Sequence, residues 1–349
     1  MPSDPINRYA ACAQCPRKCA ADRIAGAVGF CREPEEVRIA LACLHFGEEP
    51  PVTVHNGSGA IFFTGCTLRC AFCQNYQISQ HGMGRTIRQD EFTEICLRLQ
   101  DSGAENINLV TGSHAIPRLA NFIHAAQNAG CAIPFCWNSS AYERVETLRL
   151  LQDCVKIWLP DLKTLSPALA ATLFDAENYP PAATEAILWM LQNFPLRTKT
   201  EPASHDYTDS EGVRIAKGTA KEKIEQGVIV RHLFLPGHFA ETADTLAWLK
   251  EYADQRAYIS LMSQYTPVPF SESEAALIQR KKSLDAIENR LVNQQEDADL
   301  RDLIAAYDFD FLFYQELTND TSWLPDFSRK QPFSNKLATP IWHWNFGFL

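Results

Sequence analysis

The spacing of hydrophobic and polar positions changes repeatedly along the chain, from that of a β-strand to that of a helix and back. Short apolar runs typical of β-strands are separated by stretches in which apolar residues recur about every three to four positions, as on one face of a helix. Phe92, Ile95 and Leu99 have that helical spacing. Strands are predicted at 59–64, 106–110, 133–137, 155–159, 227–234 and 257–262, and helices at 90–102, 116–129, 143–152, 166–174, 182–193 and 240–252.

This alternation predicts an α/β protein with a parallel sheet, because parallel neighbours need a crossover connection that is usually helical. The pattern alone fits both an open doubly wound sheet and a curved partial barrel. In either case the loops at the carboxyl ends of the strands would gather at one edge, where α/β sites assemble.

Three segments interrupt the pattern. Residues 1–57 are loop-rich and contain five cysteines, and 195–225 form a polar insertion that we interpret as a plain surface loop rather than a mobile lid. Charged helices, a strand at 311–314 and an aromatic tail follow residue 270. We therefore predict a cysteine-rich N-terminal extension (1–57), a βα core (58–270) and a C-terminal α/β extension (271–349).

Composition narrows the classes of function. The chain has 349 residues, 46% of them hydrophobic, and a formal net charge of −10, which argues against a nucleic-acid or anionic membrane surface. No apolar run reaches the roughly 18 residues of a membrane span, and the first residues lack the apolar core of a signal peptide. Twelve cysteines without an export signal predict a cytoplasmic protein in which clustered cysteines bind metal.

Three cysteines follow the first predicted strand directly. Cys66, Cys70 and Cys73 have the spacing C-x3-C-x2-C. Three thiolates can hold three irons of a [4Fe–4S] cluster and leave the fourth iron open to substrate or cofactor, whereas a cluster that only carries electrons normally has all four irons ligated. A zinc site usually shows paired C-x2-C knuckles and a nearby fourth ligand, but the next cysteine is Cys96. The three residues are thus candidate catalytic and metal-ligating residues, and an electron carrier or redox sensor is the alternative of another class.

A second cysteine group lies in the N-terminal extension. Cys12, Cys15, Cys19 and Cys31 have the spacing C-x2-C-x3-C-x11-C, with Pro and Gly residues suited to tight turns. Four thiolates can close a zinc site or a fully ligated iron–sulfur cluster. We favour a second [4Fe–4S] cluster over zinc, because the neighbouring chemistry is already iron–sulfur.

Eight stretches together resemble the radical S-adenosylmethionine (SAM) superfamily, and within it the PflX-like branch related to pyruvate formate-lyase activating enzyme. They are residues 12–19, 45–50, 57–63, 66–75, 106–108, 159–163, 231–237 and 261–267. The resemblance implies a partial (β/α)6 TIM barrel in which the open iron binds SAM. It also implies reductive cleavage of SAM to methionine and a 5′-deoxyadenosyl radical, with flavodoxin or ferredoxin as reductant.

By the same resemblance the radical activates a glycyl-radical enzyme, and the alternative is modification of a small molecule or peptide. The resemblance also implies SAM contacts at strand ends. Phe72 would lie against the adenine, and Asp161 and Lys163 match an Asp-x-Lys element. Ser113 and His114 stand where relatives carry a Gly-Gly-Glu loop, without its carboxylate. The implied SAM-binding residues are Phe72, Asn75, Ser113, His114, Asn138, Ser139, Asp161, Lys163, Arg231 and Gln264. An ordinary ion pair, a helix cap and loop packing are the structural alternatives for individual members.

Overall fold

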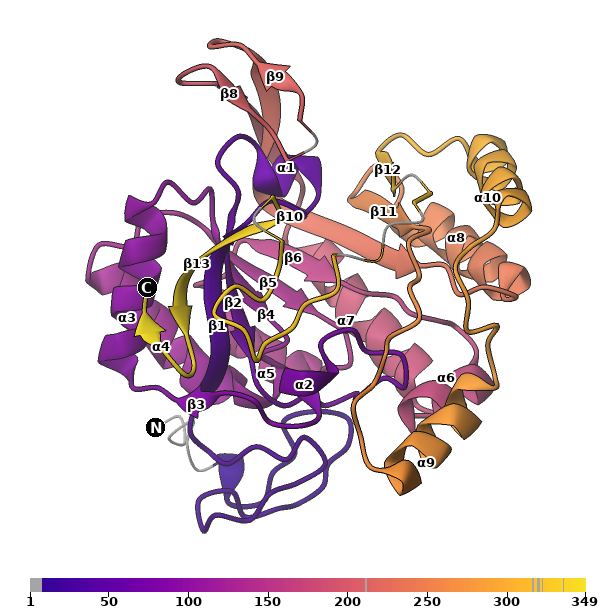
Figure 1. The fold of residues 1–349 in the computed structure, drawn as a ribbon, viewed down its shortest axis with the longest axis horizontal. Coiled ribbons are helices and arrows are strands. Elements are labelled where there is room, and N and C mark those ends of the chain that lie inside the picture. The colour runs from indigo at the N-terminus through magenta and orange to yellow at the C-terminus, as the bar shows by residue number, and fades with distance from the viewer. Residues whose placement is uncertain (1–7, 211, 316, 319–320, 322, 335) are drawn as a thin grey trace.

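A central sheet of parallel strands organises the computed structural model, which describes residues 8–349 except 211, 316, 319–320, 322 and 335 (Figure 1). The parallel strands are β2 (Ser58–Phe63), β4 (Ile107–Val110), β5 (Phe135–Ser139), β6 (Ile157–Pro160), β10 (Ala220–Leu233), β11 (Tyr258–Met262) and β12 (Leu312–Gln315). They lie side by side in chain order. The six-stranded parallel core predicted from the sequence is confirmed, and β12 extends it by one strand.

The other edge of the sheet is antiparallel. Strand β1 (Arg38–His45) lies between β2 and β13 (Ala338–His343), and β14 (Gly347–Phe348) and β3 (Arg85–Thr86) pair with β13 and β1. The prediction of a loop-rich extension is therefore wrong for β1. The sheet runs across both predicted domain boundaries. Its order ends at β12 and β14, so it is an open, curved sheet and not a closed barrel.

Helices cover the outer face of the sheet. They are α3 (Gln89–Asp101), α4 (Ile116–Asn128), α5 (Val145–Leu148), α6 (Pro167–Phe174), α7 (Tyr179–Asn193) and α8 (Phe239–Tyr252). The main apolar core lies between these helices and the strands, and it includes Ile61, Leu109 and Trp158. The helix predicted at 143–152 is split into α5 and a 3-10 turn, Arg149–Leu151. These helices hold the strands, and hence the loops at their carboxyl ends, in place.

The segment 195–225 is a β-ribbon, and the prediction of a plain loop is wrong there. Strand β7 (Arg197–Pro202) pairs antiparallel with the first half of β10, and β8 (Tyr207–Thr208) pairs with β9 (Arg214–Ile215). Figure 1 shows this ribbon projecting from the body of the molecule. Most of its side chains are exposed, so it lacks the apolar alternation by which a half-buried strand is recognised.

The inner face of the sheet is covered by the chain itself. Phe327 and Phe333, in the segment before β13, pack on Phe62 of β2 with ring centroids 5.7 and 5.5 Å away. The short helices α1 (Pro50–Thr53) and α2 (Tyr76–Ser79) and the longer helices α9 (Glu274–Leu284) and α10 (Gln294–Tyr307) complete the fold. No helix in the described part of the chain is long and apolar enough to cross a membrane.

Candidate active site

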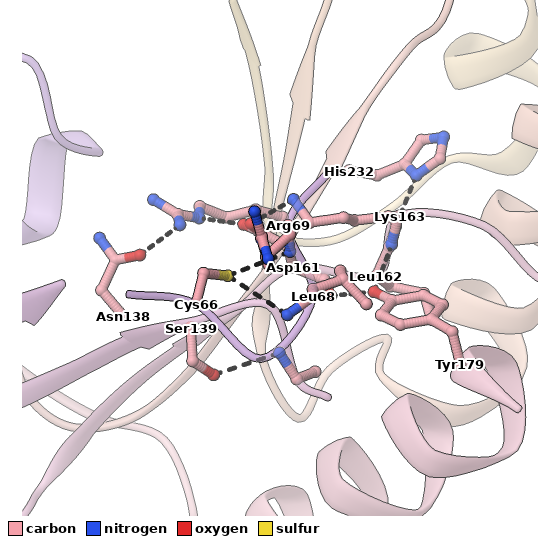
Figure 2. Close-up of polar contacts among 12 residues, drawn as sticks. Cys66, Leu68, Arg69, Asn138, Ser139, Asp161, Leu162, Lys163, Tyr179 and His232 are labelled. Carbon is pink, nitrogen blue, oxygen red and sulfur yellow. Dashed lines mark hydrogen bonds and ion pairs between the residues drawn. The ribbon is translucent and has the colours of Figure 1, made fainter. Parts of the chain in front are cut away.

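The cysteine loop begins where β2 ends. Gly65 has φ +74°, and a Cβ there would lie 2.1 Å from Cγ of Glu33, so only glycine fits the turn. The Cys66 sulfur accepts backbone N–H groups of Leu68 (3.3 Å) and Arg69 (3.4 Å), as Figure 2 shows. N–H groups directed at a sulfur stabilise a thiolate. These two N–H groups thus fix the position of the Cys66 sulfur in the loop.

Cys70 and Cys73 are set close to Cys66. Burial raises the pKa of the Cys70 thiol, Lys163 counteracts this, and the charges of Cys73 and Cys66 raise it further. Burial likewise raises the pKa of the Cys73 thiol, whose sulfur lies 3.3 Å from the Ser79 hydroxyl. Two neighbouring thiols that resist ionisation need a cation to become thiolates, and the irons of a cluster would supply it.

These residues fit a [4Fe–4S] cluster. Within the described residues, no three His, Cys, Asp or Glu side chains converge closely enough to hold a single metal ion. A cubane does not require such convergence, because each thiolate binds its own iron. A cluster held by these three residues would supply one-electron chemistry.

Arg280 of α9 was missed by sequence reasoning. Its guanidinium donates to the Ala71 carbonyl oxygen (2.7 Å) and to the Gln80 side-chain oxygen (2.9 Å), and its pairing with Glu272 holds it there. Gln80 in turn donates to the Cys70 carbonyl oxygen (2.9 Å). The C-terminal extension therefore supports the cysteine loop. Because the two segments lie far apart in the sequence, no local motif predicts this contact.

A row of hydrogen-bonded polar side chains, which we call the charged chain, crosses the ends of β5, β6 and β10. It consists of Asn138, Arg231, Asp161 and Lys163. Asp161 accepts from Lys163 Nζ (2.8 Å) and from Arg231 Nε (2.8 Å), and Arg231 also donates to the Asn138 side chain (Figure 2). Burial alone would raise the pKa of Asp161, but Arg231 and Lys163 together hold it below its ordinary value. Asp161 stays ionised at neutral pH. Four of the residues predicted to bind SAM are thus brought together here.

The Asp-x-Lys element is also fixed through its backbone. Tyr179 of α7 donates its hydroxyl to the Asp161 carbonyl oxygen (2.7 Å) and accepts the Lys163 N–H (2.9 Å). Asp161 raises the pKa of Lys163 against the effect of burial, and the charge of Cys70 acts in the same direction. Lys163 is therefore a cation between the charged chain and the cysteine loop.

Glu143 joins two of the loops predicted to hold SAM. Its carboxylate accepts from Ser113 Oγ (2.6 Å), Ser139 Oγ (2.9 Å) and Trp137 Nε1 (2.8 Å). Burial raises the pKa of Glu143, and the three donors partly offset it. The sequence showed no carboxylate in the loop after β4, and the fold brings one from the loop after β5. A single glutamate outside the eight resembling stretches gave no signal for this role.

The remaining predicted contacts are more scattered. Phe72 packs edge-on against Phe174 and Tyr265, with ring centroids 6.1 and 5.9 Å away, so the segment containing Gln264 lies beside the cysteine loop. The His114 ring is buried without a hydrogen-bond partner, and burial lowers its pKa to about 3. The side-chain oxygen of Asn75 is buried and also lacks a partner. Neither residue joins the charged chain.

Two adjacent glutamates extend the charged chain into the interior. Glu48 lies 3.6 Å from Arg231 and 3.5 Å from the ring of His45. Burial raises the pKa of Glu48 and of Glu49, and Arg231 counteracts it in both. Asn108 on β4 is buried with neither side-chain polar atom bonded. The inner face of the sheet is thus polar behind the strand ends.

The four N-terminal cysteines are also brought together. The charges of Cys31, Cys12 and Cys19 all act on the Cys15 thiol, whose pKa rises to about 12 mainly because of burial. Cys19 is exposed and the other three are buried. Backbone turns order the loop, with N–H groups of Lys18 and Ala20 donating to the carbonyl oxygens of Cys15 and Cys12.

The three-cysteine loop and the charged chain thus lie together at the strand ends of an open α/β sheet. Residues 60–202 match the model of the Radical SAM superfamily. The chain therefore contains a radical SAM superfamily domain, whose members catalyse radical chemistry and use a [4Fe–4S] cluster and SAM. Of the two cysteine groups, the matched segment includes the loop after β2 and leaves out the N-terminal four.

Comparisons with individual proteins are more distant. The uncharacterized protein MJ0674 of Methanocaldococcus jannaschii is 27% identical over 293 residues, 82% of this chain and 74% of that protein. SuiB of Streptococcus suis bound to precursor peptide SuiA has a TM-score of 0.47 at 11% identity, covering 72% of this chain. This chain spans 46% of that SuiB chain. A domain of pyruvate-formate lyase-activating enzyme from Bacteroides vulgatus has a TM-score of 0.34 at 10% identity, covering 58% of this chain and 91% of that one.

Proposed function

We propose that this protein is a radical SAM enzyme in which Cys66, Cys70 and Cys73 hold the catalytic [4Fe–4S] cluster. With SAM on the open iron, one electron would break the bond between sulfur and the 5′ carbon and release methionine and a 5′-deoxyadenosyl radical. The observation that carries the proposal is Lys163, which is charge-coupled to Cys70 and bonded to Asp161. The cluster ligands and the polar groups suited to SAM thus form one site.

The residues at the strand ends are proposed to hold SAM by charge and hydrogen bonding. Lys163 and Arg231 offset the methionine carboxylate, and Asp161 and Asn138 accept ribose hydroxyl protons. Ser113 and Ser139 both donate to Glu143, so their lone pairs can accept the methionine ammonium.

Aromatic and loop residues complete the proposed SAM site. Phe72 lies against the adenine, and Gln264 closes that side. Asn75 and His114 are also proposed as SAM contacts, because the Asn75 side-chain oxygen and both ring nitrogens of His114 are buried and lack partners.

The proposed substrate is a backbone glycine of a glycyl-radical enzyme, with a cytoplasmic flavodoxin or ferredoxin as reductant. This proposal is supported by the resemblance of the Asp-x-Lys element and the cysteine loop to activating enzymes. A small molecule or peptide is the second candidate. It is favoured by Phe327 and Phe333, which cover the inner face of the sheet and leave less room for a folded protein's loop.

Electron paramagnetic resonance (EPR) of the reduced, reconstituted protein tests whether an iron is open. Adding SAM should change the spectrum of one cluster, because the cofactor binds that iron directly. An unchanged spectrum would instead support the electron carrier or redox sensor. Incubation with candidate proteins or peptides then separates the substrates, since only a glycyl-radical enzyme gives a persistent glycyl radical.

A further inference from the structure

The two cysteine groups are built on loops that contact each other directly. Arg17, between Cys15 and Cys19, donates to the carbonyl oxygen of Thr67 (3.0 Å), which follows Cys66. Arg69, which precedes Cys70, donates to the carbonyl oxygen of Phe30 (3.4 Å), which precedes Cys31. The loops therefore share hydrogen bonds beside ligands of both groups.

Side-chain packing also joins the two cysteine loops. The Arg17 guanidinium lies 3.6 Å from the centroid of the Phe30 ring. A Cβ on Gly65 would come within 2.9 Å of the Cys31 carbonyl oxygen, so the residue before Cys66 touches a backbone atom of the other group. Both the charge of Cys66 and that of Cys31 act on Arg69. The two groups are neighbours across a single layer of side chains.

A buried arginine indicates that the N-terminal group carries negative charge. Arg23 is 1% exposed, and its Nη1 lies 3.8 Å from the Cys12 sulfur. Its other contacts are the carbonyl oxygens of Pro34 and His114 and the ring of Tyr9. Among the described residues no carboxylate forms an ion pair with Arg23. A buried cation needs an anionic partner, and metal-bound thiolates provide one.

The outer side of the same group reaches the surface. Cys19 is exposed, and so are its neighbour Lys18 and Arg32, the neighbour of Cys31. Ile24 and Val28 of the same loop are 45% and 54% exposed. Two basic and two apolar side chains thus flank this site, with Asp22 as an exposed acidic residue of the same loop, on a chain whose net charge is −10. Such a surface suits an acidic protein partner.

We propose that Cys12, Cys15, Cys19 and Cys31 hold a second [4Fe–4S] cluster that receives electrons from an acidic one-electron donor protein. This inference rests on the proposed function, since the cluster would deliver its electron to the SAM-binding cluster. A low-potential donor of the flavodoxin or ferredoxin class loses one electron, and the N-terminal cluster is reduced by one electron. That electron crosses the Arg17, Phe30 and Arg69 layer to the neighbouring cluster, where it is used in SAM cleavage.

The test compares the reconstituted holoenzyme with a Cys15→Ser/Cys19→Ser variant and with Cys131→Ala as the matched control. The wild type and control should each hold about eight irons, and the double variant about four. The EPR signal left in the double variant should still change when SAM is added. Reduction of that remaining cluster by reduced flavodoxin should be much slower than in wild type, as followed by freeze-quench EPR.

A surface variant keeps the test valid if the double variant fails to fold. Lys18→Glu/Arg32→Glu reverses the charge beside the site, and Lys217→Glu/Lys330→Glu makes the same change in net charge at other exposed positions. The first pair should slow reduction by flavodoxin about tenfold at low salt, and the second should not. Reduction by dithionite should be the same in both.

Three results would overturn the inference. They are zinc in the N-terminal site, about four irons in the wild type, or equal flavodoxin rates in both charge-reversed pairs. If any of these occurs while the wild type cleaves SAM, the proposed function stands and only the relay is rejected. If the wild type holds both clusters but forms no 5′-deoxyadenosine, the proposed function fails, and the reduction rates still test the relay.

Discussion

The cysteine loop after β2 and the N-terminal four-cysteine loop bring thiols to the same edge of the sheet by different means. Cys66, Cys70 and Cys73 follow a buried strand and are braced by Arg280 and Gln80. The N-terminal four lie in a segment of turns, held by Arg17 and Arg23. The first loop is thus positioned by the fold, and we expect the second to depend more on a bound metal for order.

Removing a ligand of the first site should have the largest effect. Cys70→Ala should abolish formation of 5′-deoxyadenosine and lower the iron content by up to one cluster, because the loop loses one of its three iron ligands. The far-ultraviolet circular dichroism should stay unchanged, since β2 and the helices do not depend on that metal. A variant that unfolds would show that both sites depend on metal in the same way.

The cation beside that site gives the next largest effect. Lys163→Met should weaken SAM binding by about 2 kcal/mol or more, roughly 30-fold in Kd, because Asp161 and the SAM carboxylate lose a charged donor. Equilibrium binding to the anaerobic enzyme measures this effect. Lys199→Met, on the exposed ribbon, serves as the control. Equal SAM affinities in the two variants would show that the Asp161–Lys163 contact is an ordinary ion pair with no part in SAM binding.

Replacing Glu143 tests whether this residue positions the SAM-binding loops or only stabilises the fold. Glu143→Gln leaves one of the three donors, Ser139, Ser113 or Trp137, without an acceptor, which should cost about 1–3 kcal/mol. The Kd for SAM should rise with it, whereas the iron content of both cysteine sites should not change. Loss of stability with unaltered SAM affinity would make Glu143 a purely structural residue.

The parallel core shows what the sequence could predict. Strands β2, β4, β5 and β6 are buried on both faces, so their apolar runs were recognisable and placed the cysteine loop at a strand end. The ribbon at 197–226 was missed because its side chains face water. Strand β1 was missed because it completes its pairing with β13, which lies at the far end of the sequence. Glu143, Arg23 and Arg280 act through contacts that only the fold creates.

Between pH 7 and pH 5.5, acid should have the smallest effect per group, about 1.4 kcal/mol, and it acts on the sheet rather than on the cysteine ligands. Burial lowers the pKa of His45 and of His232 to about 4. The unfolded chain takes up protons near pH 6.5, so stability is complete above that pH and falls as pH drops from about 6.5 to about 4, by up to roughly 1.4 kcal/mol per pH unit for each histidine. Urea unfolding at pH 7 and pH 5.5 measures this. His232→Asn should flatten the dependence, and a wild-type free energy of unfolding that does not fall would contradict these pKa values.

The central claim is that the loop after β2 makes a radical from SAM. The direct measurement is anaerobic incubation of the fully reconstituted protein with SAM and dithionite, with 5′-deoxyadenosine and methionine quantified together. We expect both products in equal amounts, and none from Cys70→Ala. A protein with its cluster loaded and reduced that leaves SAM intact would contradict the account.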